Sequence, residues 1–485
     1  MFVKIITQTR EELIELCRNE PEKAADLMLA LQAAIDRLEE RIQKLEEQLK
    51  KDSHNSHKPP SSDEYKRKTK TSRSKSKRSR GGQEGHQGTT LKMVETPHHT
   101  ITHQLITCNR CGSSLRRIKP LSYTRRQVFD IPEPKVEVTE HQCEVKQCPR
   151  CGTTTTARFP DGLTKAVQYG KNLKSIAMYL KQYQLLPSDR LQETLRDLFG
   201  CSLSEGTFFN WDKELFVALE THQQHVKEQL HTAPVLHVDE TGLLCEQKLH
   251  WLHVVSTANL SYYLQHPKRG TEAMDAIGIL PNYQGIAVHD FWKSYFSYQC
   301  GHSLCNAHLL RELEFVAETT HQRWPKQFQN LLRNMHTLVE KAKQKGLSTL
   351  QSRKIKYYER RYTILLSKAL RANPRQRGSP NRRGRKKQTP VRNLVERLRD
   401  HRISILRFIH DFRVPFTNNQ AERDLRMMKV KLKISGTFRS QHGADCFCRV
   451  RGYISTAKKN GISAFEALVR AFNGDPFVPI LKYAE

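Results

Sequence analysis

The chain has 485 residues, roughly three times the length of a typical domain, so we expect several folded units joined by linkers. Its 81 Lys and Arg outnumber its 50 Asp and Glu, and the formal net charge of +31 makes a polyanion the first partner to consider. No apolar run approaches the ~20 residues of a membrane-spanning helix, and acids stand where a signal peptide has its apolar core. We therefore expect no membrane contact and nucleic acid as the partner.

The 12 cysteines do not resemble a disulfide framework. Four of them form two Cys-x-x-Cys pairs, and most of the others are scattered singly through apolar segments. This usage fits a reducing compartment, so we expect the protein in the cytoplasm, associated with the nucleoid.

A short coiled coil is predicted at residues 22–50. Its apolar positions alternate by three and four residues between Glu, Arg and Lys: Met28, Leu31, Ile35, Leu38, Ile42, Leu45 and Leu49. Isoleucine at a and leucine at d favour a parallel two-stranded coil, and hence a homodimer. Because there are only about three heptads, an amphipathic helix packed on its own chain is the alternative.

Residues 51–92 have too few large apolar side chains to bury a core. Nine Lys or Arg and no acid lie between Lys66 and Arg80. We interpret this segment as a flexible tether to the DNA backbone, with a solvated linker as the alternative.

Residues 93–160 contain two near-copies of one short loop, Cys-Asn-Arg-Cys-Gly and Cys-Pro-Arg-Cys-Gly. Each pair can hold one side of a tetrahedral zinc ion, and four thiolates close a structural Zn²⁺ site. The four ligands are Cys108, Cys111, Cys148 and Cys151, with Cys143 as a bystander. The sequence between the pairs, 126–145, is strand-like, so we expect a zinc ribbon with an inserted hairpin; a reactive dithiol is the alternative.

Residues 161–225 predict helices. One is expected over 171–184, a second ends at Gly200, and a third begins after Ser204 as its N-cap. This spacing is similar to a DNA-binding helix-turn-helix, and an ordinary helical hairpin is the alternative.

From Pro234 the pattern becomes strand-like: PVLHVDET, LHWLHVVST and SYYLQHP, then helical TEAMDAIGIL and the strand GIAVHDFW. Asp239 ends an apolar run in the first of these strands, and Asp290 ends one in the fourth. If the first and fourth strands are neighbours, the two carboxylates lie side by side and repel unless a cation separates them. Mg²⁺ suits such oxygen ligands.

Glu422 can complete this cation site. Asn418 or Asn419 can cap a helix in TNNQAERDLRMMKVK, and Glu422 then falls in its first turn. Phosphodiester chemistry uses two such metal ions, one at the attacking oxygen and one at the leaving oxygen. Three neighbours compete for these roles, namely Asp424, Glu240 and His289, although Glu240 should face the other side of its strand.

Cations surround Glu422, with little acid beyond Asp424. They are Arg423, Arg426, Lys429, Lys431, Lys433 and Arg439, and we expect them to contact DNA phosphates; a solvated basic helix face is the alternative. A second basic run at 371–393 is broken by Pro and Gly and predicts a loop that touches DNA loosely. Cys305 and His308 are either half a metal site or a packed pair that supports the active site.

Taken together, several stretches resemble the DDE transposases of the insertion-sequence family numbered sixty-six. They include HKPPSSDEYK, GGQEGHQGTTL, CNRCG, CPRCG, LHVDETG, KRGTEAMDAIGILP, VHDFWKSYF, LCNAHLLREL and PFTNNQAERDLRMMKVKLKISGTFRS. The resemblance covers nearly the full length. It implies a multidomain α/β protein with a zipper, a zinc-binding domain, a ribonuclease-H-like catalytic domain over 226–440 and a C-terminal domain over 441–485. It also implies a helical insertion at about 309–412.

The resemblance places the acidic triad on Asp239, Asp290 and Glu422, each a ligand of Mg²⁺ or Mn²⁺. It implies a bacterial DNA transposase that binds its element ends and the target, cleaves them and transfers the strands, with element-encoded accessory proteins as further candidate partners. Two alternatives stay open: a nuclease that cuts without joining, and a regulator that binds DNA without catalysis.

Overall fold

The computed structural model describes residues 10–49, 51, 55–56, 91–376 and 388–480. Of these, residues 10–56, 166–191 and 204–480 form one compact unit, and residues 91–165 with 192–203 form a second. The basic run between Lys66 and Arg80 and residues 377–387 of the run at 371–393 lie outside the described residues. None of the described helices is both long and apolar enough to span a membrane.

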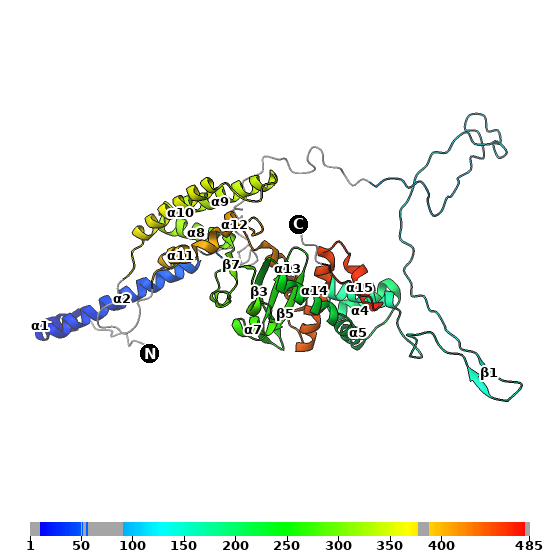
Figure 1. Ribbon diagram of the computed structural model, residues 1–485, viewed down its shortest axis with the longest axis horizontal. Coiled ribbons are helices and arrows are strands. Elements are labelled where there is room, and N and C mark those ends of the chain that lie inside the picture. Colours follow the sequence, from blue (N-terminus) through cyan, green and yellow to red (C-terminus); the bar gives the residue numbers. More distant parts are fainter. Residues whose placement is uncertain (1–9, 50, 52–54, 57–90, 377–387, 481–485) are drawn as a thin grey trace. The chain divides into compact units, whose positions relative to one another are not determined.

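The N-terminal segment is helical. Helix α1 spans Arg10–Asn19 and helix α2 spans Pro21–Leu49 (Figure 1). All seven apolar heptad positions of α2 are exposed, between 48% for Ile35 and 82% for Leu49. The alternative of a helix packed on its own chain through this seam is therefore not observed, and pairing with a second copy stays a prediction.

The cysteine-containing segment has little regular structure. Its strands are β1, Val145–Gln147, and β2, Thr154–Thr156, which pair antiparallel around the second cysteine loop. The predicted hairpin between the cysteine pairs is wrong, because residues 126–144 form no strand. Pro132 and Pro134 interrupt this stretch, and proline removes the N–H groups that a strand ladder needs.

The helices expected before the sheet are present. They are α3, Lys171–Met178, a π-helical turn η2, Tyr179–Tyr183, α4, Ser188–Phe199, α5, Glu205–Ala218, and α6, Glu220–Thr232. Ser204 caps α5 by accepting the Thr207 N–H at 3.3 Å, and Gly200 has the left-handed φ of 64° that ends a helix. Phe208, Trp211 and Leu215 of α5 are buried.

A mixed five-stranded sheet forms the centre of the larger unit. Its strands are β3, Val235–Cys245, β4, Lys248–Ser256, β5, Ser261–His266, β6, Ile286–His289, and β7, Gly301–Leu304. The order is β5-β4-β3-β6-β7, with antiparallel pairing among the first three and parallel pairing of β3 with β6 and of β6 with β7. Helix α7, Thr271–Ile277, and the 3₁₀ helices η3, Leu280–Asn282, and η4, Lys293–Ser297, complete the connections.

Successive side chains along β3 point to opposite faces of the sheet. Leu236 and Val238 pack in a core that includes Val226 and Leu230 of α6. Leu243 and Cys245 pack in another core, against helices nearer the C-terminus. Neighbouring residues of β3 therefore point into different environments.

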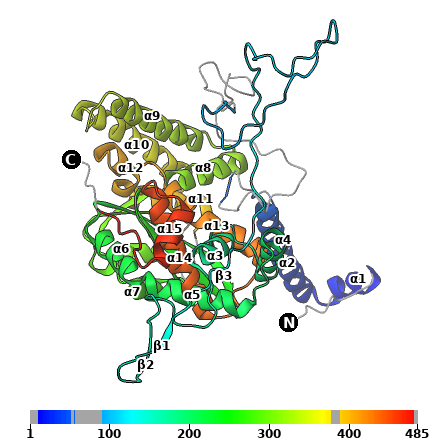
Figure 2. The ribbon, with the colours of Figure 1, turned by 90° about the vertical axis from the view of Figure 1, so that its right-hand side faces the viewer.

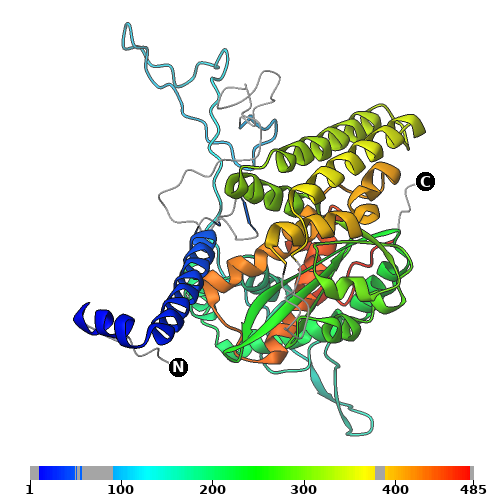
Figure 3. The same cartoon turned by 90° about the vertical axis from the view of Figure 1, so that its left-hand side faces the viewer.

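Five helices follow β7. They are α8, Asn306–Thr320, α9, Trp324–Gln344, α10, Ser352–Ala372, α11, Pro390–Asp400, and α12, Arg402–His410. They share one core, in which Phe328, Tyr362 and Phe408 are fully buried. This core also includes Val288 of β6 and Leu304 of β7, so the helices are continuous with that edge of the sheet (Figure 3).

The chain then returns to the face of the sheet that bears Leu243 and Cys245. Helices α13, Asn419–Ser435, and α14, Gln441–Lys459, cover it, and α15, Ala464–Phe472, packs on α14, α3 and α5 (Figure 2). Residues 441–485 were expected as a separate C-terminal domain. In the structure, α14 packs directly on β5 and lies in the same compact unit as the sheet.

Gly285, just before β6, tests this packing. A Cβ there would overlap the Tyr283 hydroxyl and lie 2.8 Å from the Ala233 carbonyl oxygen. We expect Gly285→Ala to lower the free energy of unfolding by about 1–3 kcal/mol, as overpacking does. Thermal denaturation measures this, with Gly206→Ala as control, since its nearest neighbour is 3.8 Å away. An unchanged midpoint for Gly285→Ala would contradict the close packing at this position.

Candidate active site

Two aspartates meet at the point where β3 and β6 run parallel. Val235 pairs with Ile286 and His237 with Val288, so the same register, two residues further on, sets Asp239 opposite Asp290. The Trp292 N–H donates to Asp290 Oδ1 at 2.8 Å, and the Glu240 N–H donates to Asp239 Oδ1 at 2.9 Å. Parallel pairing thus brings together two carboxylates that are 51 positions apart in the sequence.

Glu422 reaches the same region from helix α13. It lies in the first turn of that helix, whose N-cap residue is Asn418. The prediction that an asparagine side chain caps the helix is wrong for Asn418. Its Nδ2 instead donates to the Val238 carbonyl at 2.8 Å, and its Oδ1 accepts from His237 Nδ1 at 2.9 Å. The start of α13 is therefore tied to β3 beside Asp239.

The three carboxylates affect one another electrostatically. The pKa of Asp239 is raised well above its usual value, first by burial, then by the Glu240, Asp290 and Glu422 charges. Burial and like charges both penalise the ionised form. A nearby cation would offset both effects and favour the ionised form of Asp239.

This donor set fits a hard divalent cation. Carboxylate oxygens are the ligands that Mg²⁺ and Mn²⁺ prefer. Within the described residues, Glu422 Oε1 is buried and accepts no hydrogen bond, although such an atom normally finds a partner. Asp290 and Glu422 are near enough to Asp239 for their charges to raise its pKa, but among the described residues only Cys305, His308 and Glu422 bring three ligand atoms within 4.8 Å of one another.

Cys305 and His308 lie next to Glu422. The Cys305 thiol, the His308 ring and the Glu422 carboxylate offer ligand atoms within 4.8 Å of one another, and His308 Nε2 is 3.4 Å from Glu422 Oε1. Cys305 is fully buried where α8 begins; its Sγ accepts the Asn418 N–H at 3.1 Å, and burial raises its pKa to about 11. The pair thus joins the starts of α8 and α13.

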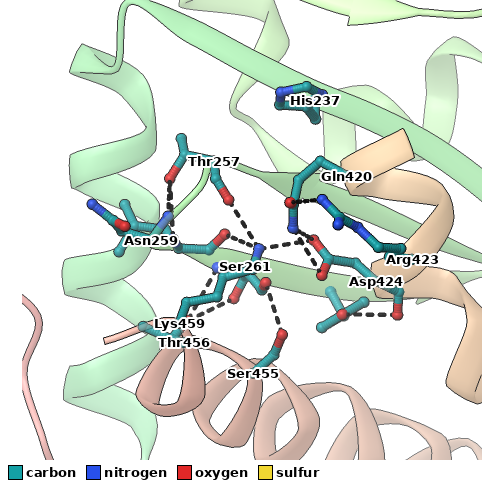
Figure 4. A network of polar contacts seen from close by, with 12 residues as sticks. His237, Thr257, Asn259, Ser261, Gln420, Arg423, Asp424, Ser455, Thr456 and Lys459 are labelled. Atoms are coloured by element: carbon teal, nitrogen blue, oxygen red, sulfur yellow. Dashed lines mark hydrogen bonds and ion pairs between the residues drawn. The ribbon is translucent and has the colours of Figure 1, made fainter. Parts of the chain in front are cut away.

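The two rival acids are engaged elsewhere. Glu240 points to the opposite face of β3, where Arg269 binds its Oε1 at 2.8 Å and the Tyr295 hydroxyl donates to its Oε2. Asp424 binds Lys459, whose ammonium also donates to the Thr257 and Leu260 carbonyls at 2.9 Å (Figure 4). Asp424 therefore fastens α13 to the β4–β5 turn and to α14.

The candidate DNA-contacting cations are not equivalent. Those with exposed side chains are Arg423, Arg426, Lys429, Lys433 and Arg439. Arg439 is paired with Glu205 at 3.1 Å. Lys431 lies over the Phe438 and Phe447 rings, and burial lowers its pKa to about 8, so it is the least available to a phosphate.

Sequence patterns gave no indication of several residues around the acids. His237, Arg269 and Lys459 act through partners between 29 and 202 positions away. A weak sign exists for His237, because it shares the face of Asp239 in the strand pattern LHVDET.

The two cysteine loops have the same backbone geometry. Cys108 and Cys148 each accept the N–H of the glycine four residues later at 2.9 Å. Hydrogen bonds from Ser113 lower the pKa of Cys111 to about 7, and those from Thr153 lower the pKa of Cys151. The cysteine thiols of the two pairs do not lie close enough to form one metal site in this structure. Within the described residues, only Cys305, His308 and Glu422 bring three ligand atoms within 4.8 Å of one another.

Comparison with known families adds to this geometry. The sequence model of the transposase IS66 family matches residues 166–446, more than half of the chain, and spans all three acids. The zinc-finger binding domain of transposase IS66 matches residues 106–152, which contain both cysteine pairs. A family of unknown function, DUF6444, matches residues 9–92. No curated protein matches closely enough to add to these findings.

The fold and the two matches define a transposase with a zinc finger. The chain belongs to the transposase IS66 family. The zinc-finger match also supports a structural Zn²⁺ ion.

The raised pKa of Asp239 leads to a prediction about thermal stability. The pKa of Asp239 is higher in the folded chain than in the unfolded chain. Asp239 therefore adds to the free energy of unfolding below about pH 3.8, and this contribution is lost as the pH rises through the folded pKa. At pH 7 without metal, Asp239→Asn should therefore raise the melting temperature by a few degrees, at roughly 2–4 °C per kcal/mol. Mg²⁺ should stabilise the wild type and not the variant. The exposed Asp36→Asn is the control, and an equal response to Mg²⁺ in Asp239→Asn would contradict this account.

Zinc content gives a separate test. We expect the purified chain to hold one zinc ion, measured by mass spectrometry of the element, and Cys111→Ser or Cys148→Ser to lose it, because a thiolate ligand is removed. Cys143→Ser is the matched control and should retain zinc. Zinc loss in Cys143→Ser alone would show that the ligands are assigned wrongly.

Proposed function

We propose that this chain is a DNA transposase that cuts its element ends and joins them to target DNA with Asp239, Asp290 and Glu422. The observation that carries the proposal is the parallel register of β3 and β6, which sets the two aspartates opposite each other. Glu422 adds a third carboxylate whose charge affects Asp239. Membership of the transposase IS66 family supports this choice of reaction.

The strand order supports a ribonuclease-H-like catalytic domain. Numbered along the chain, the five strands lie in the order third, second, first, fourth, fifth. The acids stand on the first strand, just after the fourth, and on a helix after the helical insertion. We propose that residues 226–440 form this domain, with α14 packed on it.

The three carboxylates would hold two Mg²⁺ or Mn²⁺ ions. When bound, such ions lower the pKa of an attacking water or 3′ hydroxyl and stabilise the leaving oxygen. The rest of the work falls to the chain. Asp239 has a raised pKa that a bound cation would lower, Asn418 and His237 hold α13 against β3, and Lys459 fixes the same helix through Asp424.

DNA would meet the site through exposed cations. Arg423, Arg426, Lys429 and Lys433 project from the helix that carries Glu422, and phosphate contacts by such residues position DNA without reading its sequence. We assign recognition of the element ends to the zinc finger and to residues 161–225. The exposed seam of α2 would pair two chains, so that two ends meet.

The test is a joining assay with purified protein, labelled DNA from the ends flanking its gene, target plasmid and Mg²⁺ or Mn²⁺. We expect joined products from the wild type. Asp239→Asn, Asp290→Asn and Glu422→Gln should each lower the rate about a hundredfold or more, since a metal ion contributes several kcal/mol to the transition state.

Asp275→Asn is the matched control, because this exposed aspartate on α7 accepts only from Tyr298 among the described residues. Hydrolysis without joined product would favour a nuclease over a transposase. DNA binding without metal-dependent cleavage would favour a regulator, and full activity of Glu422→Gln would overturn the assigned triad.

A further inference from the structure

A tryptophan-flanked arginine lies on the face of β3 that bears Glu240 and is linked to Asp290 through Trp292. The Arg269 guanidinium carbon is 3.0 Å from the centre of the Trp292 ring and 4.7 Å from the centre of the Trp251 ring. Trp292 is also the residue whose N–H donates to the Asp290 carboxylate. Arg269 thus contacts a residue that is itself bonded to one of the proposed metal ligands.

Glu240 holds one edge of the same guanidinium. Arg269 Nε and Nη2 both donate to Glu240 Oε1, at 2.9 and 2.8 Å. Glu240 is almost completely buried, with 1% of its side chain exposed, and its other oxygen accepts from Tyr295. The two rings and this carboxylate fix the orientation of the guanidinium without using all of its donors.

The remaining edge is accessible. Nη1 has no partner among the described residues, and 39% of the Arg269 side chain is exposed. Lys268 and Lys293, the chain neighbours of Arg269 and Trp292, are exposed as well. A guanidinium held in a fixed orientation with one edge exposed is suited to an anion, and a phosphate takes such a donor in a fixed geometry.

We infer that Arg269 Nη1 binds a backbone phosphate of the DNA strand that is cut at Asp239 and Asp290. The inference rests on the proposed function, which brings a DNA strand to these acids. A strand approaching this group of carboxylates meets repulsion. A fixed cation next to Trp292 offsets it at one phosphate, while the acids remain free for metal ions.

The test neutralises one DNA phosphate at a time. Duplexes of the element end, each with a single methylphosphonate, are bound to Asp239→Asn protein, which retains Arg269 and cannot cleave. We expect one position near the scissile bond to lose about tenfold in affinity, as for one charged hydrogen bond. Adding Arg269→Met should lower the affinity for unmodified DNA by a similar factor and abolish the loss at that position alone.

Glu240→Gln separates this contact from simple charge balance. Suppose that Arg269 only neutralises Glu240. Adding Glu240→Gln to Arg269→Met would then restore the affinity for unmodified DNA, and each methylphosphonate would lower the affinity by the same factor with and without Arg269. Either result would overturn the inference. We expect the double variant to remain insensitive at the contacted position. The binding assay needs no chemistry, so its outcome is independent of whether the wild type cuts or joins DNA.

Discussion

The parallel pairing of β3 with β6 is the constraint on which the rest of the site depends. It sets Asp239 opposite Asp290, where burial first, and then the charges of Glu240, Asp290 and Glu422, disfavour ionisation of Asp239. Two unit charges 4 Å apart repel by about 4 kcal/mol at an effective dielectric of 20, several times the net gain of a typical hydrogen bond. Such an arrangement disfavours the fully ionised site, and the cation proposed above would offset this repulsion.

The surrounding structure holds the carboxylates in place despite this repulsion. Asn418 joins the first turn of α13 to β3 and to Cys305, and the Asp424–Lys459 ion pair joins the next turn to α14 and the β4–β5 turn. On the opposite face, Arg269 and Tyr295 retain Glu240. Adjacent acids in the sequence therefore have separate roles, because alternation along a strand and rotation along a helix send them to different partners.

Much of the sheet followed from local patterns. Apolar runs predicted four of the five strands, and Asp239 and Asp290 were expected to lie close together because each follows one of these runs, although β3 itself continues past Asp239 to Cys245. The strand β7 was not found, because Gly301–Leu304 is short and half polar. The hairpin predicted over 126–145 is wrong, because residues 126–144 form no strand and Pro132 and Pro134 interrupt this stretch.

The support of the site could not be predicted in the same way. An asparagine before a helix ordinarily predicts a cap, yet the Asn418 side chain bonds to β3, 180 residues away. Lys459 and Arg269 look like ordinary surface cations in the sequence, and only tertiary packing gives them carboxylate partners. Glu422 was chosen over Asp424 through family resemblance, and the ion pair of Asp424 supplies a physical reason for that choice.

The most direct measurement of the central claim is anomalous diffraction at the manganese edge from crystals of the protein soaked in Mn²⁺. We predict anomalous density bounded by the carboxylates of Asp239, Asp290 and Glu422. Density confined to the side of Glu422 that faces Cys305 and His308, or none near Asp239 and Asp290, would contradict the assignment of these acids as the metal-binding catalytic set.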